Sequence, residues 1–236
     1  MATPTNTREY EGDSVLEIMS KYAVNRNQYV FDLITDNFGL KDLGHSAAIM
    51  EFGAGRGEFI NRFKDWKQLE TFALEIDPAY FQNLNQDHHA LLSLADRPKQ
   101  MNFIYAIDVL EHIEDDEQAF SDLYDALEPG GKLLIYVPAR MELYSPFDKS
   151  IGHFRRYHKK ELGDKIKAAG FQLEKLRYHE LIGYFAAYYN KFFSKNGELN
   201  AAAVRTYDKL IVPTTNILEK VINPPIGKSL YALASK

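Results

Sequence analysis

The chain of 236 residues is 45% hydrophobic and 26% charged, which allows one sizeable core and one elaboration, so we expect a single domain over residues 1–236. The lack of cysteine excludes a disulfide framework, a thiolate nucleophile and a zinc site with cysteine ligands. The net charge of −5 gives no overall attraction to phosphate backbones, so nucleic acid is not the first choice of partner.

The first forty residues begin with a polar stretch that carries Glu9, Glu11 and Asp13, unlike the cationic start and apolar core of a secretion signal. Nowhere in the chain does an apolar run reach the length that spans a membrane. We therefore expect a cytoplasmic protein with no transmembrane segment. Over Ser14–Phe38, apolar residues recur at helical spacing, which predicts that residues 1–40 form a helical cover over a pocket.

Short apolar runs then alternate with helical patterns, which is typical of an α/β protein with a doubly wound, mostly parallel sheet. Seven strands are predicted, the third of them more weakly than the rest: Ala47–Phe52, Thr71–Ile76, Ala90–Leu94, Asn102–Ile107, Lys132–Val137, Phe171–Tyr178 and Ser229–Ala234. A helix is expected to begin at Asp115 or Asp116 and to end at Pro129-Gly130-Gly131. Another is expected before Gly170, which would take a left-handed conformation.

A segment of about fifty residues separates the last two strands, too long for a simple link, so we predict a helical cap over residues 181–226. Its second helix, Ala202–Ile222, is expected to break at Pro213. In its first helix, four aromatic residues share a face that would pack in the core, wall an acceptor pocket or form a homodimer interface: Phe185, Tyr188, Tyr189 and Phe192.

The first strand leads through three glycines, Gly53, Gly55 and Gly57, toward a predicted helix, and such a turn admits a ligand against bare backbone. A dinucleotide fingerprint would place its third glycine at the position of Glu58, so a nicotinamide cofactor is disfavoured. Glu58 would also repel a pyrophosphate at the helix N-terminus. Glu75 ends the second predicted strand, where its carboxylate can accept hydrogen bonds from a ribose diol. The pattern therefore favours a nucleoside without phosphate.

The pattern Glu51-x-Gly53-x-Gly55-x-Gly57, followed by Glu75, resembles that of the class I S-adenosylmethionine-dependent methyltransferases. The likeness continues through Ala106–Ile113 and Leu127–Leu133. The resemblance implies a Rossmann-like methyltransferase fold with an antiparallel last strand, and an enzyme that uses S-adenosyl-L-methionine.

The same resemblance implies roles for individual residues. Gly53, Ala54 and Gly55 would line the methionine and ribose, and Glu75 would hold the ribose hydroxyls. Ile76 would flank the adenine, and Asp96 would lie near its amino group. The methionine end would be close to Asp108. The rest of the predicted cofactor site consists of three residues: Glu51, Gly57 and Val109.

A long, charged and aromatic loop follows the fifth strand and would lie over the crevice where doubly wound folds bind ligands. We predict His153 as the catalytic base, with His112 and Tyr157 as further catalytic candidates. Packing of the loop is the alternative role of His153. Arg155 and Arg156 would either clamp an acidic acceptor or pair with carboxylates such as Asp148.

A metal site is a second interpretation of the same region. Four side chains offer oxygen and imidazole ligands suitable for magnesium, manganese or zinc: Asp108, Glu111, His112 and His153. The set resembles that of some family members that methylate polyphenols or RNA 2′-hydroxyls. Because Glu-His at this point is widespread in members that use no metal, we predict that no metal is bound.

The leading functional prediction is methyl transfer to an oxygen or nitrogen atom of a small, partly apolar or aromatic acceptor. Two alternatives remain open. One is methylation of RNA or another macromolecule, with or without a metal ion, which would require an open basic surface. The other is a binding module that keeps the nucleoside site without turnover.

Overall fold

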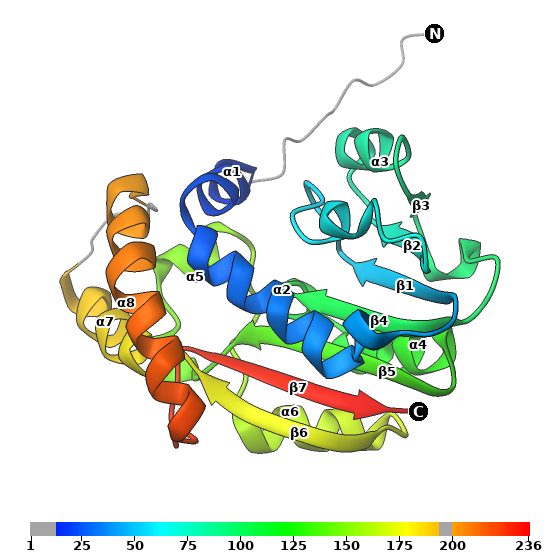
Figure 1. Ribbon diagram of the computed structural model, residues 1–236. Coiled ribbons are helices and arrows are strands. Elements are labelled where there is room, and N and C mark those ends of the chain that lie inside the picture. The colour runs from blue at the N-terminus through cyan, green and yellow to red at the C-terminus, as the bar shows by residue number, and fades with distance from the viewer. Residues whose placement is uncertain (1–12, 194–199) are drawn as a thin grey trace, which may run out of the picture.

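A seven-stranded sheet runs through the middle of the computed structural model, which describes residues 13–193 and 200–236 (Figure 1). The strand order is β3-β2-β1-β4-β5-β7-β6. The strands are β1 (Ala47–Phe52), β2 (Leu69–Leu74), β3 (His89–Leu91), β4 (Met101–Ile107), β5 (Leu127–Pro138), β6 (Gln172–His179) and β7 (Ser229–Ser235). Neighbours from β3 to β5 are parallel, and β7 is antiparallel to both β5 and β6. The predicted fold class and the antiparallel last strand are confirmed.

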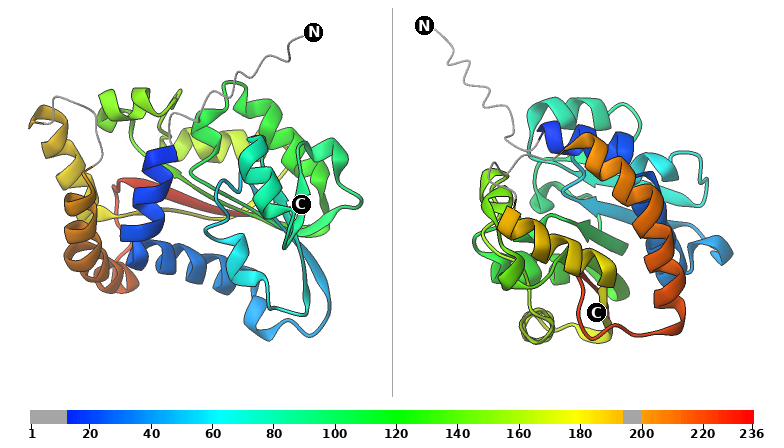
Figure 2. Two further views of the ribbon diagram at one scale, coloured as in Figure 1. Left: turned by 90° about the horizontal axis from the view of Figure 1, so that it is seen from above. Right: turned by 90° about the vertical axis from the view of Figure 1, so that its left-hand side faces the viewer.

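Helices cover both faces of this sheet (Figures 1 and 2). The α-helices are α1 (Asp13–Tyr22), α2 (Val24–Phe38), α3 (Pro78–Leu84), α4 (Asp116–Ala126), α5 (Pro146–Ser150), α6 (Lys159–Ala168), α7 (Leu181–Phe193) and α8 (Ala201–Val221). Short 3-10 helices are η1 (Leu40–Asp42), η2 (Ile60–Phe63), η3 (Leu94–Asp96), η4 (Leu110–His112) and η5 (Met141–Leu143). Among the described helices, none combines the length and the apolar character needed to cross a bilayer.

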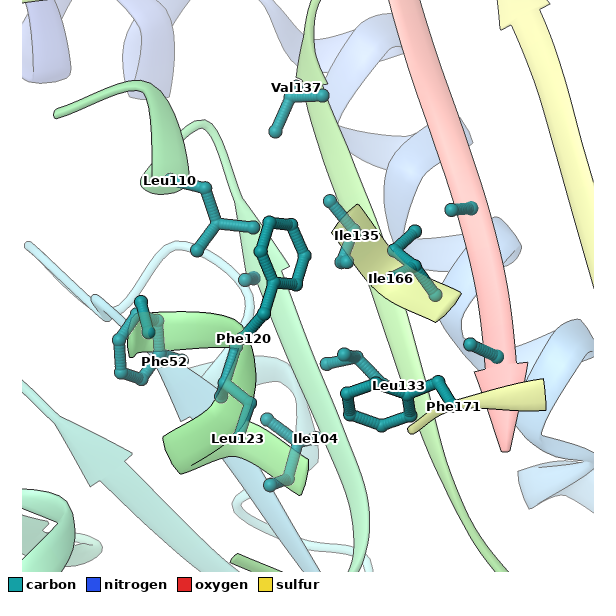
Figure 3. Packing of buried hydrophobic residues seen from close by; sticks show 14 of the residues in the cluster. Phe52, Ile104, Leu110, Phe120, Leu123, Leu133, Ile135, Val137, Ile166 and Phe171 are labelled. Carbon is teal, nitrogen blue, oxygen red and sulfur yellow. The ribbon is translucent and has the colours of Figure 1, made fainter. Parts of the chain in front are cut away.

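The core lies in two layers, one on each face of the sheet. On one face, Phe120 of α4 and Ile166 of α6 pack on Leu133 and Ile135 of β5 (Figure 3). On the other face, α2 contributes apolar residues that include Ile34. Because both faces are covered, every residue of β1 is buried, and strands of this kind appear in the sequence as continuous apolar runs.

The helix predicted over residues 14–38 is two helices that meet at Ala23, whose backbone is not helical. The cause of this break is a contact with α8, which is far from α2 in the sequence. The backbone N–H groups of Asn25 and Arg26, in the first turn of α2, donate to the carboxylate of Asp208 on α8 at 3.0 and 2.9 Å. This cap satisfies amides that would otherwise lack a partner, so α2 begins as a separate helix.

Three local predictions need correction. Helix α4 ends at Ala126, and Pro129-Gly130-Gly131 lies inside β5 rather than at the end of the helix. The glycine loop leads into the short 3-10 helix η2 instead of an α-helix. Helix α8 continues through Pro213, because a proline removes a single N–H donor and buried Val212 and Thr215 hold the helix on either side of it.

The aromatic face of α7 is not part of the core. Phe185, Tyr188 and Tyr189 are 58%, 45% and 62% exposed. The side chain of Phe192 lies outside the described residues. Core packing is therefore the wrong interpretation of the three described rings, and none of them lines the cleft described below.

Candidate active site

A cleft of about 1250 Å³ opens at the carboxyl ends of the parallel strands. Its floor includes the last residues of β1, β2, β4 and β5, namely Phe52, Leu74, Ile107 and Pro138. In Figure 1 the arrowheads of β1 and β4 point toward the side of the molecule where α1 and α5 lie. This is the position at which doubly wound folds bind ligands.

The glycine loop after β1 forms one wall of the cleft. Gly53, Gly55 and Gly57 all have positive φ, at 76°, 52° and 80°, which favours glycine at each position. A Cβ atom on Gly53 would also lie 2.4 Å from Cγ2 of Val109. Gly53 and Ala54 donate backbone hydrogen bonds to the Leu74 carbonyl, both at 2.9 Å. The loop is thus pinned to the end of β2.

Gly57 differs from the other two glycines because it does not line the cleft. A Cβ atom there would meet the side chains of Asn61 and Leu84 at 2.6 and 2.9 Å. Its role is to let the loop pack against these neighbours, so the predicted contact with a cofactor is corrected to a role in shaping the loop.

Glu51 lines the cleft at the base of the loop and is buried. One carboxylate oxygen accepts hydrogen bonds from the Ile60 backbone N–H at 2.8 Å and from the Tyr105 hydroxyl at 3.2 Å. Burial raises the pKa of Glu51 to about 8, even though these two donors favour the charged form. Glu51 therefore ties η2 and β4 to the strand that carries the loop.

Glu75 follows the end of β2 and joins the two halves of the loop region. Its two oxygens accept the backbone N–H groups of Gly55 at 2.6 Å and Asp77 at 2.8 Å. A carboxylate has about four acceptor sites. Two therefore remain, and because Glu75 lines the cleft they can meet the two hydroxyls of a ribose.

Ile76 and Val109 also line the cleft, and Ile76 is exposed in the absence of a ligand. Together they offer apolar surface on which a flat base can lie. Asp96, predicted to contact the adenine, belongs to η3 and does not line the cleft. That prediction is corrected, because the lining contributed by this part of the chain ends at Tyr80, before β3 begins.

Asp108 lies where β4 ends and has a positive φ of 52°, which is uncommon outside glycine. Its backbone N–H donates to the Tyr136 carbonyl at 2.8 Å, and its carboxylate pairs with Arg26 of α2. The Arg26 guanidinium lies over the Tyr136 ring, 5.2 Å from the centroid. No motif in the sequence indicated that Arg26 would enter the cleft.

The loop after β5 brings His153 into the same cleft and fixes its orientation. Nδ1 of His153 lies 3.0 Å from Oδ1 of Asp148, which also accepts a hydrogen bond from Nε of Arg156 at 2.7 Å. Burial alone would raise the pKa of Asp148, but the bond from His153 and the charge of Arg156 lower it to about 2. Asp148 is thus ionised and accepts the Nδ1 proton, which leaves the lone pair of a neutral His153 on Nε2.

Nε2 of His153 faces Glu111, at 3.7 Å from Oε1. Glu111 is completely buried, and neither carboxylate oxygen has a hydrogen-bond partner among the described residues. Burial and the neighbouring Asp108 raise the pKa of Glu111 well above its usual range. The ring of His112 stands perpendicular to that of His153, with centroids 4.5 Å apart, and burial together with His153 lowers the pKa of His112 to about 4.

Of the four side chains that formed the alternative metal set, Glu111, His112 and His153 converge, with one ligand atom from each within 4.8 Å of the others. Asp108 lines the cleft but pairs with Arg26 instead of joining this group. Arg155 pairs with Asp116 and Arg156 with Asp148, both at 2.7 Å, so both arginines bind carboxylates within the chain.

Tyr157, a predicted catalytic candidate, is fully buried and does not line the cleft. Its hydroxyl donates to Oδ2 of Asp116 at 2.7 Å and also lies 3.2 Å from the Leu110 carbonyl. The prediction is corrected, because these bonds make Tyr157 an anchor between the loop and α4 that cannot reach an acceptor.

The far end of the cleft contains groups that the sequence did not indicate. Glu180 has a positive φ of 62° and accepts hydrogen bonds from the Ser229 hydroxyl at 2.7 Å and from Nζ of Lys228 at 3.3 Å. Apolar side chains of α1, among them Leu16 and Met19, also line the cleft, and Leu16 lies 3.5 Å from where a Cβ atom on Gly55 would be. The lining of the cleft is therefore partly polar and partly apolar.

Comparisons with known proteins agree on the fold and the family. The family model of methyltransferase domains matches residues 22–176, which include the glycine loop, Glu75 and His153. No curated protein matches the sequence. A SAM-dependent methyltransferase from Archaeoglobus fulgidus superposes with a TM-score of 0.60 at 17% identity, over 95% of this chain and 100% of that one.

Two further solved structures have nucleoside ligands. A mycolic acid cyclopropane synthase complexed with S-adenosylhomocysteine gives a TM-score of 0.58 at 15% identity, over 88% of this chain and 83% of that one. A phosphoethanolamine N-methyltransferase from Haemonchus contortus in complex with S-adenosyl-L-methionine gives a TM-score of 0.51 at 16% identity, over 88% and 56%. The chain belongs to the methyltransferase domain family and is an S-adenosylmethionine-dependent methyltransferase with S-adenosyl-L-methionine as its cofactor.

Proposed function

We propose that this enzyme methylates an oxygen or nitrogen atom of a small, partly apolar acceptor that binds at the His112–His153 end of the cleft. The observation that carries this proposal is that both imidazoles line the same cleft as Gly53 and Glu75. At about 1250 Å³, the cleft is larger than most single-ligand sites, which occupy roughly 300–1000 Å³. It therefore has room for a cofactor and a small second ligand.

The cofactor position follows from the donors and acceptors around the glycine loop. The ribose hydroxyls would bind the free acceptor sites of Glu75, and the adenine would lie between Ile76 and Val109. The methionine part would then extend past Gly53 toward Asp108. This orientation directs the methyl group toward the imidazoles, and it rests on the hydrogen-bonding capacity of the lining residues.

The chemistry requires little covalent help, because a sulfonium methyl group is already activated and alignment supplies most of the acceleration. An acceptor hydroxyl or ammonium group must lose its proton. His153 and His112 are the catalytic residues that we propose for this step, with Asp148 holding His153 in position. Phe147 and Ile151 of the loop would contact the apolar part of the acceptor.

The aromatic face of α7 stays available for a homodimer, and this remains a prediction, as does the cytoplasmic location. Exposed rings at Phe185 and Tyr189 are typical of an interface. Sedimentation of the chain and of Tyr189→Lys over a range of concentrations tests the dimer. A monomer at all concentrations would contradict it.

The acceptor proposal is tested in two steps. S-adenosylhomocysteine is first titrated into the protein by calorimetry, and we expect a Kd in the micromolar range. Radiolabelled S-adenosylmethionine is then supplied with separate sets of phenols, small amines and aliphatic alcohols, and with total RNA as the contrasting acceptor. Label in one of the small-molecule sets supports the proposal. Label in RNA alone, with an affinity that falls steeply with salt, would overturn it in favour of a macromolecular acceptor.

A further inference from the structure

The side chains of Glu111, His112 and His153 form a compact group of metal-binding type at the acceptor end of the cleft. One ligand atom from each lies within 4.8 Å of the other two. Glu111 and His112 belong to η4 after β4, and His153 belongs to the loop after β5, so two neighbouring parallel strands bring them together. In place of the metal-free site expected from the sequence, we propose that these three side chains bind a divalent transition-metal ion.

Glu111 is buried without a hydrogen-bond partner in the described part of the chain. An unpartnered buried carboxylate is strongly unfavourable and calls for an explanation such as an ion that is not part of the polypeptide. The guanidinium groups of Arg26 and Arg156 each pair with another carboxylate, Asp108 and Asp148, and Nη1 of Arg156 makes no hydrogen bond to Glu111. A bound cation would supply the partner that Glu111 lacks.

The ring of His153 is oriented with Nδ1 toward Asp148 and Nε2 toward Glu111. In a neutral His153 whose Nδ1 donates to Asp148, the lone pair of Nε2 points toward Oε1 of Glu111, at 3.7 Å. This separation is too long for a hydrogen bond. Two ligands of a tetrahedral ion with bonds of about 2.1 Å are about 3.4 Å apart, so a small movement of either side chain would complete the coordination.

Each of the two imidazoles is also held by a hydrogen bond to another part of the chain. Metal-binding histidines almost always donate their second ring N–H to a carboxylate or a carbonyl group. Asp148 plays this part for His153, and Asp148 itself is fixed by the Ser145 hydroxyl at 2.8 Å and by Arg156. His112 is hydrogen-bonded to the backbone of Gly152. Both rings are thus held in place before an ion arrives.

The ligand types select the class of metal. Two imidazoles and one carboxylate suit zinc, manganese or cobalt, whereas magnesium and calcium prefer oxygen ligands. Three protein ligands leave a coordination position open, as in catalytic rather than structural sites. Building on the proposed function, an ion here would lie beside the acceptor. With Nε2 of His153 bound to it, the ion would replace the imidazole as the group that favours the ionised form of a hydroxyl, which makes hydroxylated molecules the preferred acceptor class.

Cobalt binding tests the site without any acceptor. The full chain is stripped of metal with a chelator and titrated with Co²⁺, whose visible absorption reports nitrogen and oxygen ligands. We expect one Co²⁺ per chain, micromolar affinity and displacement by Zn²⁺ but not by Mg²⁺. Glu111→Gln and His153→Gln should each weaken binding by more than about tenfold, and Asp148→Asn by about 10- to 100-fold. His45→Gln, an exposed histidine outside the cleft, should match the unchanged protein.

S-adenosylhomocysteine affinity, measured on the same samples, shows which variants are folded. A chain that binds S-adenosylhomocysteine but gives no cobalt spectrum would overturn the metal site and leave the proposed function intact. Cobalt binding that survives the substitutions of Glu111, His153 and Asp148 would also overturn it, because the ion would then lie elsewhere. A cobalt spectrum without S-adenosylhomocysteine binding would instead count against the placement of the cofactor.

Discussion

The two ends of the cleft are built in different ways. At the cofactor end, the glycine loop and Glu75 come from a stretch of 23 residues, and their contacts are mostly backbone hydrogen bonds such as those of Gly53 and Gly55. At the acceptor end, Arg26, Glu111 and His153 come from three distant parts of the chain. The contacts there are between side chains, and several of those side chains are charged and buried.

This difference determines which residues can change at each end of the cleft. The backbone of the glycine loop binds groups that every S-adenosylmethionine molecule has, so its requirements are steric and local. The acceptor end depends on side chains held by loops, whose identity can change without disturbing the sheet. The fold therefore fixes the donor, while the loops decide the acceptor.

The largest effect is expected at His153. His153→Ala should lower methyl transfer by about 10²- to 10⁴-fold and leave the affinity for S-adenosylhomocysteine unchanged, because the ring lies at the acceptor end. Single-turnover transfer and calorimetry measure the two quantities. Tyr157→Phe is the matched control: it removes only the hydroxyl that binds Asp116, so it should reduce stability by about 1 kcal/mol and keep the transfer rate. A large loss of rate in Tyr157→Phe would restore its catalytic role.

At the cofactor end, a substitution of Gly53 tests the steric requirement of the glycine loop. Gly53→Ala should weaken S-adenosylhomocysteine binding by about 100-fold, because the new Cβ meets Val109 and the positive φ strains an alanine. Gly130→Ala is the control, since Gly130 also has a positive φ but nothing lies within 4 Å of the added atom. It should cost about 1 kcal/mol of stability and leave the affinity unchanged. Equal losses of affinity in both variants would show that strain, and not the shape of the loop, is responsible.

Sequence reasoning succeeded where structure depends on neighbouring residues. The strand β1 and the helix α6 with left-handed Gly170 follow from local patterns. The cofactor end also came from a local motif, although Gly57 and Asp96 lie outside the cleft lining. Spacing alone cannot tell a glycine that meets a ligand from one that meets Asn61, since both require the same backbone conformation.

The acceptor end could be predicted only in part. His112 and His153 were found because they follow neighbouring parallel strands, which meet at one edge of the sheet. Arg26 was missed because its partner Asp108 is 82 residues away, and the start of α2 was missed because Asp208 is 182 residues beyond Arg26. No pattern in a single sequence identifies such pairs. They arise from the way α1, α2 and α8 pack beside the sheet (Figure 2).

Glu75 should show a smaller effect than Gly53. Glu75→Ala is expected to weaken S-adenosylhomocysteine binding by roughly 1–3 kcal/mol, because hydrogen bonds to the ribose and the tether to Gly55 are lost together. Calorimetry on Glu70→Ala, which changes an exposed carboxylate on the same strand, provides the comparison and should show no loss. Unchanged affinity in Glu75→Ala would remove the ribose from this residue and the cofactor orientation with it.

The remaining prediction concerns stability instead of binding or transfer, and it comes from Glu51. Its pKa is raised from 4.5 to about 8 by burial, so between these values the folded chain binds more protons than the unfolded chain. Stability should therefore fall as pH rises from 5 to 8, by on the order of 3–4 kcal/mol from this group. Glu51→Gln keeps an acceptor for the Ile60 N–H but cannot ionise, so its stability should decline less over this range.

Urea unfolding at several pH values, without cofactor, measures this difference directly. Every other titrating group is common to the two proteins, so the difference between their curves isolates Glu51. Glu174→Gln, at an exposed position on β6, should follow the unchanged protein at every pH. Parallel curves for Glu51→Gln and the unchanged protein would mean that Glu51 ionises without cost, and that the base of the glycine loop is as well solvated as the surface. If the two stability curves diverge, a neutral Glu51 holds the backbone at the cofactor end. At the acceptor end, Asp148 is instead charged and holds the side chain of His153.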